Sequence, residues 1–443
     1  MTLDKFNELR SEHPEFIYHS YSVTDGGFSF HFSVDSYEFR PEWKFCGITV
    51  PDGIDRKLYE YIVFSIGMVE LVSYWKCACP PRVKVQCGAL SDEQIQWWKK
   101  LYWGGLGEFF YRNGISTDFD SFMTIECESR EQPAFSDIFA GSRKGALIPV
   151  GGGKDSIVTL ELLKNMQQDN LCFLINPRKT TTDCAHTAGY DDGHIVGFTR
   201  TIDPELLKRN ADGWLNGHTP FSAIVAFSSY LAAVLTGKKY IALSNESSAN
   251  EGNVGGSDVN HQYSKSTAFE RDFREYCGKW LLPEPVYFSL LRPWTEWQIA
   301  KKFVQYPRYF PVFRSCNLGS KKDVWCCDCA KCLYVYIMLA AFLDDDTLVS
   351  IFGTDMLDNT DHRRLFMALE NPDLDKPFEC VGTRAEIKLA LHRACERRTG
   401  KKMPALLAEY MREEHGTPED LDGYFDEDNF VPAELIGLLK EGK

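Results

Sequence analysis

The chain has 443 residues, of which 44% are hydrophobic and 25% charged, and its formal net charge is −14. This length is enough for two or three domains, and the composition is typical of a globular protein. The acidic balance argues against a large nucleic-acid-binding face, and the lack of an apolar run of about 18 residues argues against a membrane span.

The first residues, MTLDKFNELRSEHPE, are polar and acidic and do not form a secretory signal. We therefore expect a cytoplasmic protein whose fifteen cysteines are reduced thiols or metal ligands rather than disulfides. Ten of them are scattered along the chain, as small buried hydrophobic residues often are.

Residues 1–135 are predicted to form a separate N-terminal α+β domain. The predicted strands, which show alternating or β-rich composition, are 16–23, 27–34 and 45–50. Two helices are predicted at 57–75 and 91–111, the second with Ser91 as its N-cap. The polar stretch 128–143 marks the end of this domain.

Residues 136–345 are predicted to form a second domain, in which short apolar strands alternate with helices. The predicted strands are 147–150, 171–176, 194–198 and 240–244, and the predicted helices are 157–163, 183–189 and 221–235. This alternation predicts an α/β fold with a doubly wound, mostly parallel sheet. Ligands of such sheets bind at the carboxyl ends of the strands, so Gly151, Asn176 and Ser244 should line one crevice.

The most informative segment is ALIPVGGGKDSIVTLELLK, residues 146–164, in which a strand meets three glycines and then a helix. Glycines allow a tight turn and a close approach to an anion, and the helix offers unpaired N–H groups and its positive dipole end. The segment predicts a phosphate-binding loop. The alternative is a strand–helix turn that binds no ligand.

Two common phosphate loops do not fit this segment. The Walker A loop needs glycine where Ile148 stands and Ser or Thr where Asp155 stands. The dinucleotide-binding fingerprint needs glycine at Ser156 and an acidic residue where Asn176 ends the next strand.

The segment instead resembles the PP-loop ATP pyrophosphatases, with Gly151 in place of the first serine of their pattern. This resemblance implies cleavage of ATP to AMP and pyrophosphate. In this scheme Gly151, Gly152, Gly153 and Ser156 bind the phosphates, Lys154 supplies a counter-charge and Asp155 contacts Mg²⁺.

A polar stretch, residues 244–266, follows the last predicted strand and is dense in hydrogen-bonding side chains. Loops of this kind are uncommon unless they have a function. With Asn176, the predicted nucleotide-binding residues here are Asn245, Glu246 and Glu251. The carboxylates of Glu246 and Glu251 suit Mg²⁺ or an amino group. The predicted acids, bases or oxyanion partners are His261, Tyr263 and Lys265. The alternative is a solvated loop without a ligand.

Five cysteines cluster in SCNLGSKKDVWCCDCAKC, residues 315–332. Cys326, Cys329 and Cys332 form C-x2-C-x2-C, and with Cys316 they can close a tetrahedral, structural zinc site. Cys327 is the spare thiol. An iron–sulfur cluster is the rival metal centre, and a thiol cluster without metal is the third possibility.

The segment 346–443 is predicted to be a helical C-terminal region. A predicted helix at 333–343 precedes it. The helices predicted within it are 361–369, 384–397, 404–414 and 432–439.

Further stretches, together with the phosphate loop and the cysteine cluster, resemble the UDP-N-acetylmuramoyl-L-alanyl-L-glutamate epimerase family over nearly the whole chain. These stretches are YWKCACPP, LGEFFYRNGI, SNESSANEGN, HQYSKS and KPFECVGT. The resemblance implies an ATP- and magnesium-dependent inversion of the terminal glutamate of a nucleotide-linked peptidoglycan precursor. The candidates for proton transfer are His261, Tyr263, Lys265 and Cys380.

Two other functions stay open from the sequence. Another PP-loop adenylating enzyme, such as an amide ligase or a nucleobase- or tRNA-modifying synthase, would share the loop and the cysteine cluster. A zinc-stabilised binding protein with a degenerate nucleotide fold is supported only by Gly151. Nothing in the sequence indicates an oligomeric state.

Overall fold

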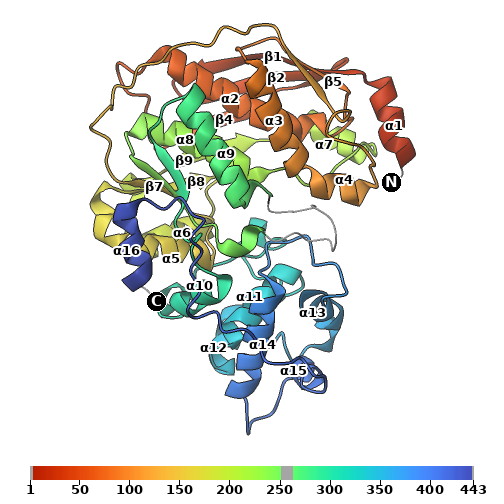
Figure 1. Cartoon of the computed structure of the whole chain (residues 1–443), viewed down its shortest axis with the longest axis vertical. Helices are drawn as coiled ribbons and strands as arrows, with labels where there is room; N and C mark the ends of the chain where they lie inside the picture. The colour runs from red at the N-terminus through yellow and green to blue at the C-terminus, as the bar shows by residue number, and fades with distance from the viewer. Residues whose placement is uncertain (1–2, 251–262, 442–443) are drawn as a thin grey trace.

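The protein is α/β and is built on one large, mostly parallel sheet (Figure 1). The computed structural model describes residues 3–250 and 263–441. Its eleven strands run in the order β11-β10-β7-β8-β9-β4-β2-β1-β5-β6, and β3 pairs with β2 outside this path. Six of the ten strand pairs are parallel.

The N-terminal segment supplies the strands at one side of the sheet. They are β1 (Glu15–Thr24), β2 (Gly27–Val34), β3 (Tyr37–Phe39), β4 (Glu42–Cys46), β5 (Arg82–Val85) and β6 (Thr124–Cys127). The prediction of a strand over 45–50 was wrong in its position. The chain leaves the sheet at Gly47, which has φ +64°, and a Cβ there would lie 2.5 Å from the Ile195 carbonyl oxygen.

The remaining strands form a parallel set. They are β7 (Ala146–Pro149), β8 (Leu171–Ile175), β9 (Ile195–Thr201), β10 (Tyr240–Leu243) and β11 (Val286–Ser289). Because β7 lies between β8 and β10, the chain winds first to one side of β7 and then to the other. The switch point between β7 and β10 is where open α/β sheets bind their ligands.

Helices cover both faces of the parallel set. Those before the C-terminal region are α1 (Leu3–Glu12), α2 (Arg56–Trp75), α3 (Asp92–Gly105), α4 (Gly107–Asn113), α5 (Lys154–Leu162), α6 (Lys179–Ala188), α7 (Pro204–Ala211), α8 (Phe221–Thr236), α9 (Thr267–Trp280) and α10 (Glu296–Phe303). Alternate strand residues face opposite sides. Leu147 therefore packs in the core with α2 and α8, whereas Ile148 packs in the second core with α5 and α6.

The predicted helix over 91–111 is divided in two. Ser91 caps α3 as expected, because its hydroxyl accepts a hydrogen bond from the Gln94 N–H at 3.2 Å, and the Gln94 side chain completes a capping box. α3 ends at Gly105 and α4 begins at Gly107, so Leu106 separates them.

The C-terminal region is helical, and α11 to α15 form the lower part of the molecule in Figure 1. Its helices are α11 (Ala330–Ala340), α12 (Asp345–Phe352), α13 (Arg363–Glu370), α14 (Arg384–Arg397), α15 (Ala405–Tyr410) and α16 (Ala433–Glu441). The 3-10 turns of the chain are η1 (Lys164–Asp169), η2 (Asp192–His194), η3 (Ser247–Asn250), η4 (Tyr263–Lys265), η5 (Pro307–Tyr309), η6 (Ser320–Lys322) and η7 (Thr360–His362). α15 is shorter than the predicted helix 404–414.

Several contacts cross the predicted domain boundaries, and two of them involve the sheet. β4 pairs with β9 in antiparallel register, with Trp43 opposite Arg200, so the sheet is continuous across residue 135. α16 returns to the sheet, where Glu434 forms an ion pair with Lys239 at 3.3 Å. The division into 1–135, 136–345 and 346–443 stays a prediction from the sequence.

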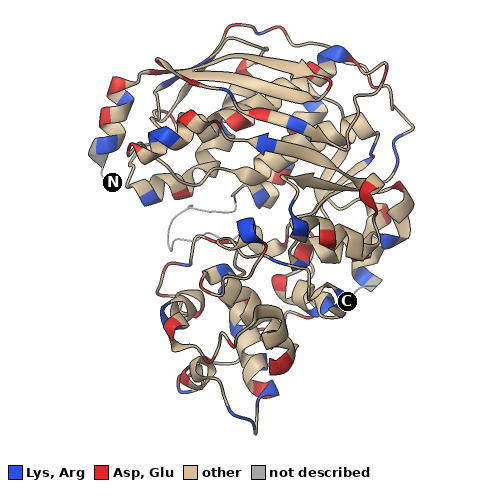
Figure 2. Cartoon of the chain, turned by 180° about the vertical axis from the view of Figure 1, so that it is seen from behind, with Lys and Arg blue, Asp and Glu red and all other residues tan. Residues whose placement is uncertain are grey.

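Charged residues of both signs are interspersed along the elements seen from behind in Figure 2. Within the described ranges, no helix is both long and apolar enough to cross a lipid bilayer.

Candidate active site

The glycine loop follows β7 and turns directly into α5 at the switch point of the sheet. Gly152 has φ +86°, and a Cβ there would lie 2.6 Å from Thr180 Cγ2, so this position requires glycine. Gly153 is the N-cap of α5. A Cβ at Gly151 would meet nothing within 4 Å, so the serine of the PP-loop pattern would fit there without a clash.

The loop is held from two sides. The Arg314 backbone N–H donates to the Gly152 carbonyl at 2.8 Å, and the Cys184 thiol lies 3.7 Å from the same oxygen. The Ser156 hydroxyl donates to the Gly153 carbonyl at 2.9 Å. These contacts fix the loop so that the free N–H groups of the first turn of α5 form one end of the site.

Lys154, the first residue of α5, is only 1% exposed, and its ammonium group forms ion pairs with Asp155 and Glu296. Burial lowers the pKa of Lys154, but the two carboxylates outweigh burial and raise it above its usual value. The same ammonium group outweighs the effect of burial on Asp155 and lowers the pKa of that carboxyl. The site therefore holds a fixed positive charge beside the glycine loop.

Two further carboxylates that the sequence analysis missed lie behind Lys154. Glu296 begins α10, and its backbone N–H donates to the Glu386 carboxylate at 2.7 Å. Burial raises the pKa of Glu296 and of Glu386 to about 7. Glu246 is also buried, and burial together with the charge of Asp155 raises its pKa.

These raised pKa values make stability fall as the pH rises. Between pH 4.5 and about 7 the folded Glu386 keeps a proton that the unfolded chain has released, so folding is penalised. From pH 5 to pH 8, we expect the free energy of unfolding of the wild type to fall by about 1–3 kcal/mol more than that of Glu386→Gln. Urea unfolding at both pH values measures this.

Thr383 donates its backbone N–H to Glu386 at 2.6 Å, and the substitution weakens this bond. Only the part of the cost that does not depend on pH cancels, because the measurement compares the change in unfolding free energy between the two pH values. An equal pH dependence for the two proteins would contradict the raised pKa.

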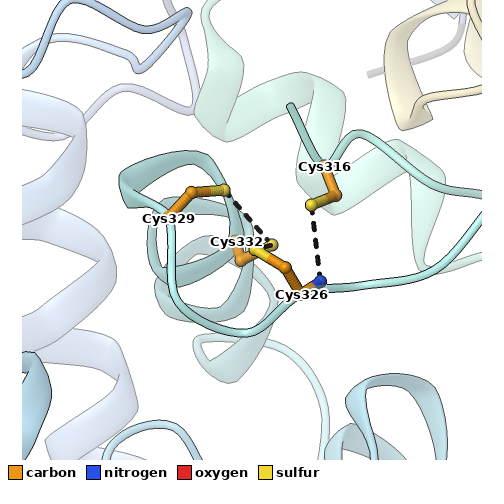
Figure 3. Close-up of side chains that lie close together, drawn as sticks. All are labelled: Cys316, Cys326, Cys329 and Cys332. Carbon is orange, nitrogen blue, oxygen red and sulfur yellow. Dashed lines mark hydrogen bonds between the residues drawn. The ribbon is translucent and has the colours of Figure 1, made fainter. Parts of the chain in front are cut away.

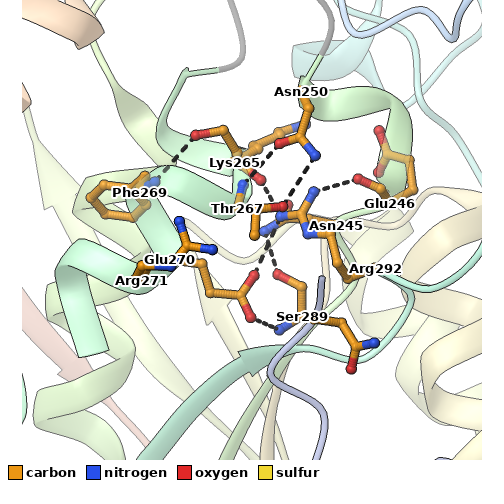
Figure 4. A network of polar contacts seen from close by, with 12 residues as sticks. Asn245, Glu246, Asn250, Lys265, Thr267, Phe269, Glu270, Arg271, Ser289 and Arg292 are labelled. Atoms are coloured by element: carbon orange, nitrogen blue, oxygen red, sulfur yellow. Dashed lines mark hydrogen bonds and ion pairs between the residues drawn. The ribbon is translucent and has the colours of Figure 1, made fainter. Parts of the chain in front are cut away.

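Arg292 organises the polar stretch after β10 (Figure 4). It is fully buried, its guanidinium donates to the backbone carbonyls of Glu246 and Lys265, and it pairs with Glu270 at 3.3 Å. Arg292 thus fixes the points where the chain leaves β10 and where it returns before α9.

The predicted nucleotide-binding amides make contacts within the protein. The Asn245 side chain donates to Ser289 Oγ at 3.0 Å, and Asn176 accepts from the Arg200 backbone N–H at 2.7 Å. Their roles in nucleotide binding stay predictions. Glu251 and His261 lie outside the described residues.

Lys265 and Cys380, far apart in the sequence, meet in the site. The Lys265 ammonium lies 3.1 Å from the Cys380 sulfur. Burial lowers the pKa of Lys265, but Cys380 and Glu246 outweigh burial and raise it. Lys331 donates its ammonium to the Cys380 carbonyl and its backbone N–H to Glu379 at 2.7 Å.

Tyr263 lies at the other end of η4. Its ring packs directly on Gly104, where a Cβ would lie 2.7 Å from the ring. Burial raises the pKa of Tyr263 above its usual value of 10, so the phenol stays protonated at neutral pH.

The four predicted cysteine ligands gather into one cluster (Figure 3). All four sulfurs lie within 4.8 Å of one another, with Cys332 3.7 Å from Cys326 and 3.5 Å from Cys329. Four sulfurs around one zinc ion at about 2.3 Å would be about 3.8 Å apart, so the cluster fits a tetrahedral metal site.

Cys327 lies outside the cluster, in agreement with the prediction that it is the spare thiol. Its thiol lies 3.3 Å from the Phe352 carbonyl, and its backbone has φ +57°. The cluster also touches both parts of the site, because Arg314 binds Gly152 and Asn317 donates to Glu379 at 3.0 Å.

Comparison of the sequence with known proteins shows the family of the chain. Residues 6–290 match the family profile described as the MurL N-terminal domain, and residues 312–422 match the MurL C-terminal domain. The chain belongs to the MurL family. The N-terminal match includes the glycine loop, and the C-terminal match includes the cysteine cluster and Cys380.

Three MurL relatives carry the name UDP-N-acetyl-alpha-D-muramoyl-L-alanyl-L-glutamate epimerase. The protein of Xanthomonas oryzae is 35% identical over 334 residues, which cover 74% of this chain and 72% of the relative. The proteins of a Micromonospora species and of Salinispora tropica are 35% and 34% identical and cover 77% and 76% of this chain, and 76% and 74% of their own lengths. No solved structure matches this MurL chain significantly.

Proposed function

We propose that this protein converts the terminal L-glutamate of UDP-N-acetylmuramoyl-L-alanyl-L-glutamate into D-glutamate and that cleavage of ATP to AMP and pyrophosphate drives the reaction. The observation that carries the proposal is the meeting of a glycine-rich loop and buried Lys154 with the Lys265–Cys380 pair in one site. The printed name of the MurL relatives supports the choice of substrate.

Adenylation explains why an epimerase would use ATP. The α-hydrogen of a carboxylate is very weakly acidic, because the carbanion would lie beside a negative charge. An oxygen of the α-carboxylate attacks the α-phosphorus of ATP, and the bond from that phosphorus to pyrophosphate breaks. The resulting acyl adenylate is an activated anhydride whose carbanion delocalises as an enolate.

The phosphate loop suits the binding of ATP. Backbone N–H groups at the start of α5 would bind the phosphates, and the ammonium group of Lys154 would add positive charge nearby, where charge develops during adenylation. Asp155 and Glu246 offer carboxylate oxygens that would hold Mg²⁺, which neutralises phosphate charge when bound.

Cys380 is the base that we assign to proton removal. An ammonium group at 3.1 Å favours a thiolate over a thiol, and Lys265 is held in place by the Arg292 contact to its backbone. The thiolate takes the α-proton from the acyl adenylate, and a proton returns on the opposite face, for which His261 and Tyr263 are the predicted donors. Water then cleaves the acyl–phosphate bond and releases AMP.

We expect Cys380→Ser to reduce epimerisation by about 10²–10⁴-fold, because a serine hydroxyl is a far weaker base than a thiolate. ATP–pyrophosphate exchange should continue, since adenylation precedes proton removal. Cys46→Ser is the matched control, because Cys46 is half-buried in β4 and contacts Thr199 at 3.4 Å, outside the site. Epimerisation at the wild-type rate in Cys380→Ser would remove Cys380 from this role.

The test of the function is incubation with UDP-N-acetylmuramoyl-L-alanyl-L-glutamate, ATP and magnesium, followed by chiral analysis of glutamate and assay of AMP. We expect D-glutamate only when ATP is present, together with AMP. AMP without inversion would favour another adenylating enzyme with a different acceptor. Neither product would favour the binding-protein alternative.

A further inference from the structure

A cavity of about 550 Å³ lies between α3, α4 and η4, and Tyr263 is its one lining residue that has a role in the chemistry proposed above. Four aromatic side chains line it, namely Trp103, Phe110, Tyr111 and Tyr263. Lys100 and Thr117 add polar groups. Concave sites of this size with mostly apolar walls and a few polar groups are typical of small-molecule binding sites.

Two elements connect this cavity to the Lys265–Cys380 pair. The first is η4, which carries Tyr263 on the cavity wall and Lys265 at its other end, about 4 Å further along the turn. The second is the segment before Cys380. The ring of Phe378 lies 5.4 Å from the ring of Tyr111.

Tyr111 is fixed at this junction by a second contact. Its hydroxyl donates to the Asp375 carboxylate at 2.9 Å. The aromatic cavity and the proposed base are therefore neighbours within one site, and a ligand that reaches Cys380 can extend into the cavity.

The proposed substrate has a chain of suitable length for this arrangement. Consecutive α-carbons are about 3.8 Å apart, and the glutamate is separated from the sugar by one alanine and one lactyl group. The sugar ring therefore begins about 10 Å from the carbon that loses its proton. The uridine diphosphate lies beyond the sugar, further from the reacting carbon.

We infer that this cavity binds the N-acetylated sugar of the substrate, an assignment that rests on the proposed function. A pyranose ring has apolar C–H faces that pack on aromatic rings, and its hydroxyl and acetamido groups can reach the polar groups of Lys100 and Thr117. Trp103 is the main wall, because its ring is braced by Phe110 at 5.5 Å and Phe122 at 5.2 Å. The uridine diphosphate extends out of the cavity.

The test is calorimetric titration of the full chain with UDP-N-acetylmuramic acid and, separately, with UDP, both without ATP. We expect Trp103→Leu to raise the Kd for UDP-N-acetylmuramic acid at least tenfold and to leave the Kd for UDP unchanged. Trp280→Leu is the matched control, because Trp280 ends α9 and packs on Tyr276 at 5.0 Å away from this cavity. Tyr111→Leu, at a side chain that is 46% exposed, provides a second variant if Trp103→Leu does not fold.

Equal weakening of UDP and of the sugar nucleotide would show a nucleobase site and overturn the inference. Unchanged binding of both ligands, or no binding of UDP-N-acetylmuramic acid by the wild type, would also overturn it. Because these titrations need neither ATP nor turnover, a selective loss of sugar binding would support the cavity even if the epimerase assay failed. If Trp103→Leu were an active epimerase with an unchanged KM, the proposed function would stand, and only the assignment of the cavity to the sugar would be refuted.

Discussion

Asp155→Asn is expected to lower ATP-dependent turnover by about 10²–10³-fold while the protein stays folded. The substitution keeps the size of the side chain but removes the negative charge that pairs with Lys154 and that would contact Mg²⁺. Charge beside the phosphates matters most in the transition state, so the loss should appear mainly in kcat. The measurement is the rate of AMP formation, with a thermal melt to check folding.

The fold should survive this change for two reasons. Lys154 keeps its ion pair with Glu296, and the Asp155 side chain is 26% exposed rather than fully buried. Asp183→Asn is the matched control, because Asp183 pairs with Lys179 at 2.5 Å on the surface of α6. Full activity in Asp155→Asn would place the nucleotide elsewhere in the molecule.

Cys332→Ser is expected to release the metal and to lower the melting temperature by at least about 5 °C. Cys332 contacts both Cys326 and Cys329, so its loss opens the tetrahedron. Metal binding to such sites contributes about 10–16 kcal/mol in small zinc peptides, and even a fraction of this is large for one substitution. Elemental analysis of the purified protein measures the metal and distinguishes zinc from iron.

The same variant should also lose epimerase activity. Arg314 and Asn317 flank Cys316 and contact Gly152 and Glu379, so collapse of the cluster would disturb the glycine loop and the segment that carries Cys380. Cys327→Ser is the control, since this thiol faces Phe352 and not the cluster. Metal retained in Cys332→Ser, or lost in Cys327→Ser, would mean that the ligands are assigned incorrectly.

The parts of the site that the sequence predicted are those whose residues are contiguous or regularly spaced. The glycine loop and the cysteines are local patterns. The glycines reflect the need for a tight turn, and the cysteine spacing reflects the geometry of a tetrahedral metal site. Glu296 and Glu386 escaped notice because each lies within a capping box. Glu296 lies inside Thr-x-x-Gln and Glu386 ends Thr-x-x-Glu, so the start of a helix already explains both residues. Arg292 gave no signal, because two of its partners are backbone carbonyls and its third partner, Glu270, lies 22 residues earlier in the chain.

Long-range pairing was also beyond the sequence. Residues 42–46 alternate, with Trp43 inward and Glu42 and Lys44 exposed, but the segment is only five residues long, so the sequence favours the more apolar stretch 45–50 as the strand. Nothing local indicates that β4 pairs with β9, about 150 residues later. Similarly, the meeting of Lys265 with Cys380 depends on how the C-terminal region folds back on the sheet.

The antiparallel junction of β4 and β9 has a consequence for how the chain can be divided. A fragment that began at residue 136 would end its sheet at β9 and leave a row of unpaired N–H and C=O groups. It would also uncover the Phe198 ring, which now lies 5.7 Å from Trp43 and from Phe45. Such an open edge recruits strands from other molecules and leads to aggregation. The N-terminal strands therefore protect the half that carries the glycine loop from self-association, and we expect the two halves to be stable only as one polypeptide.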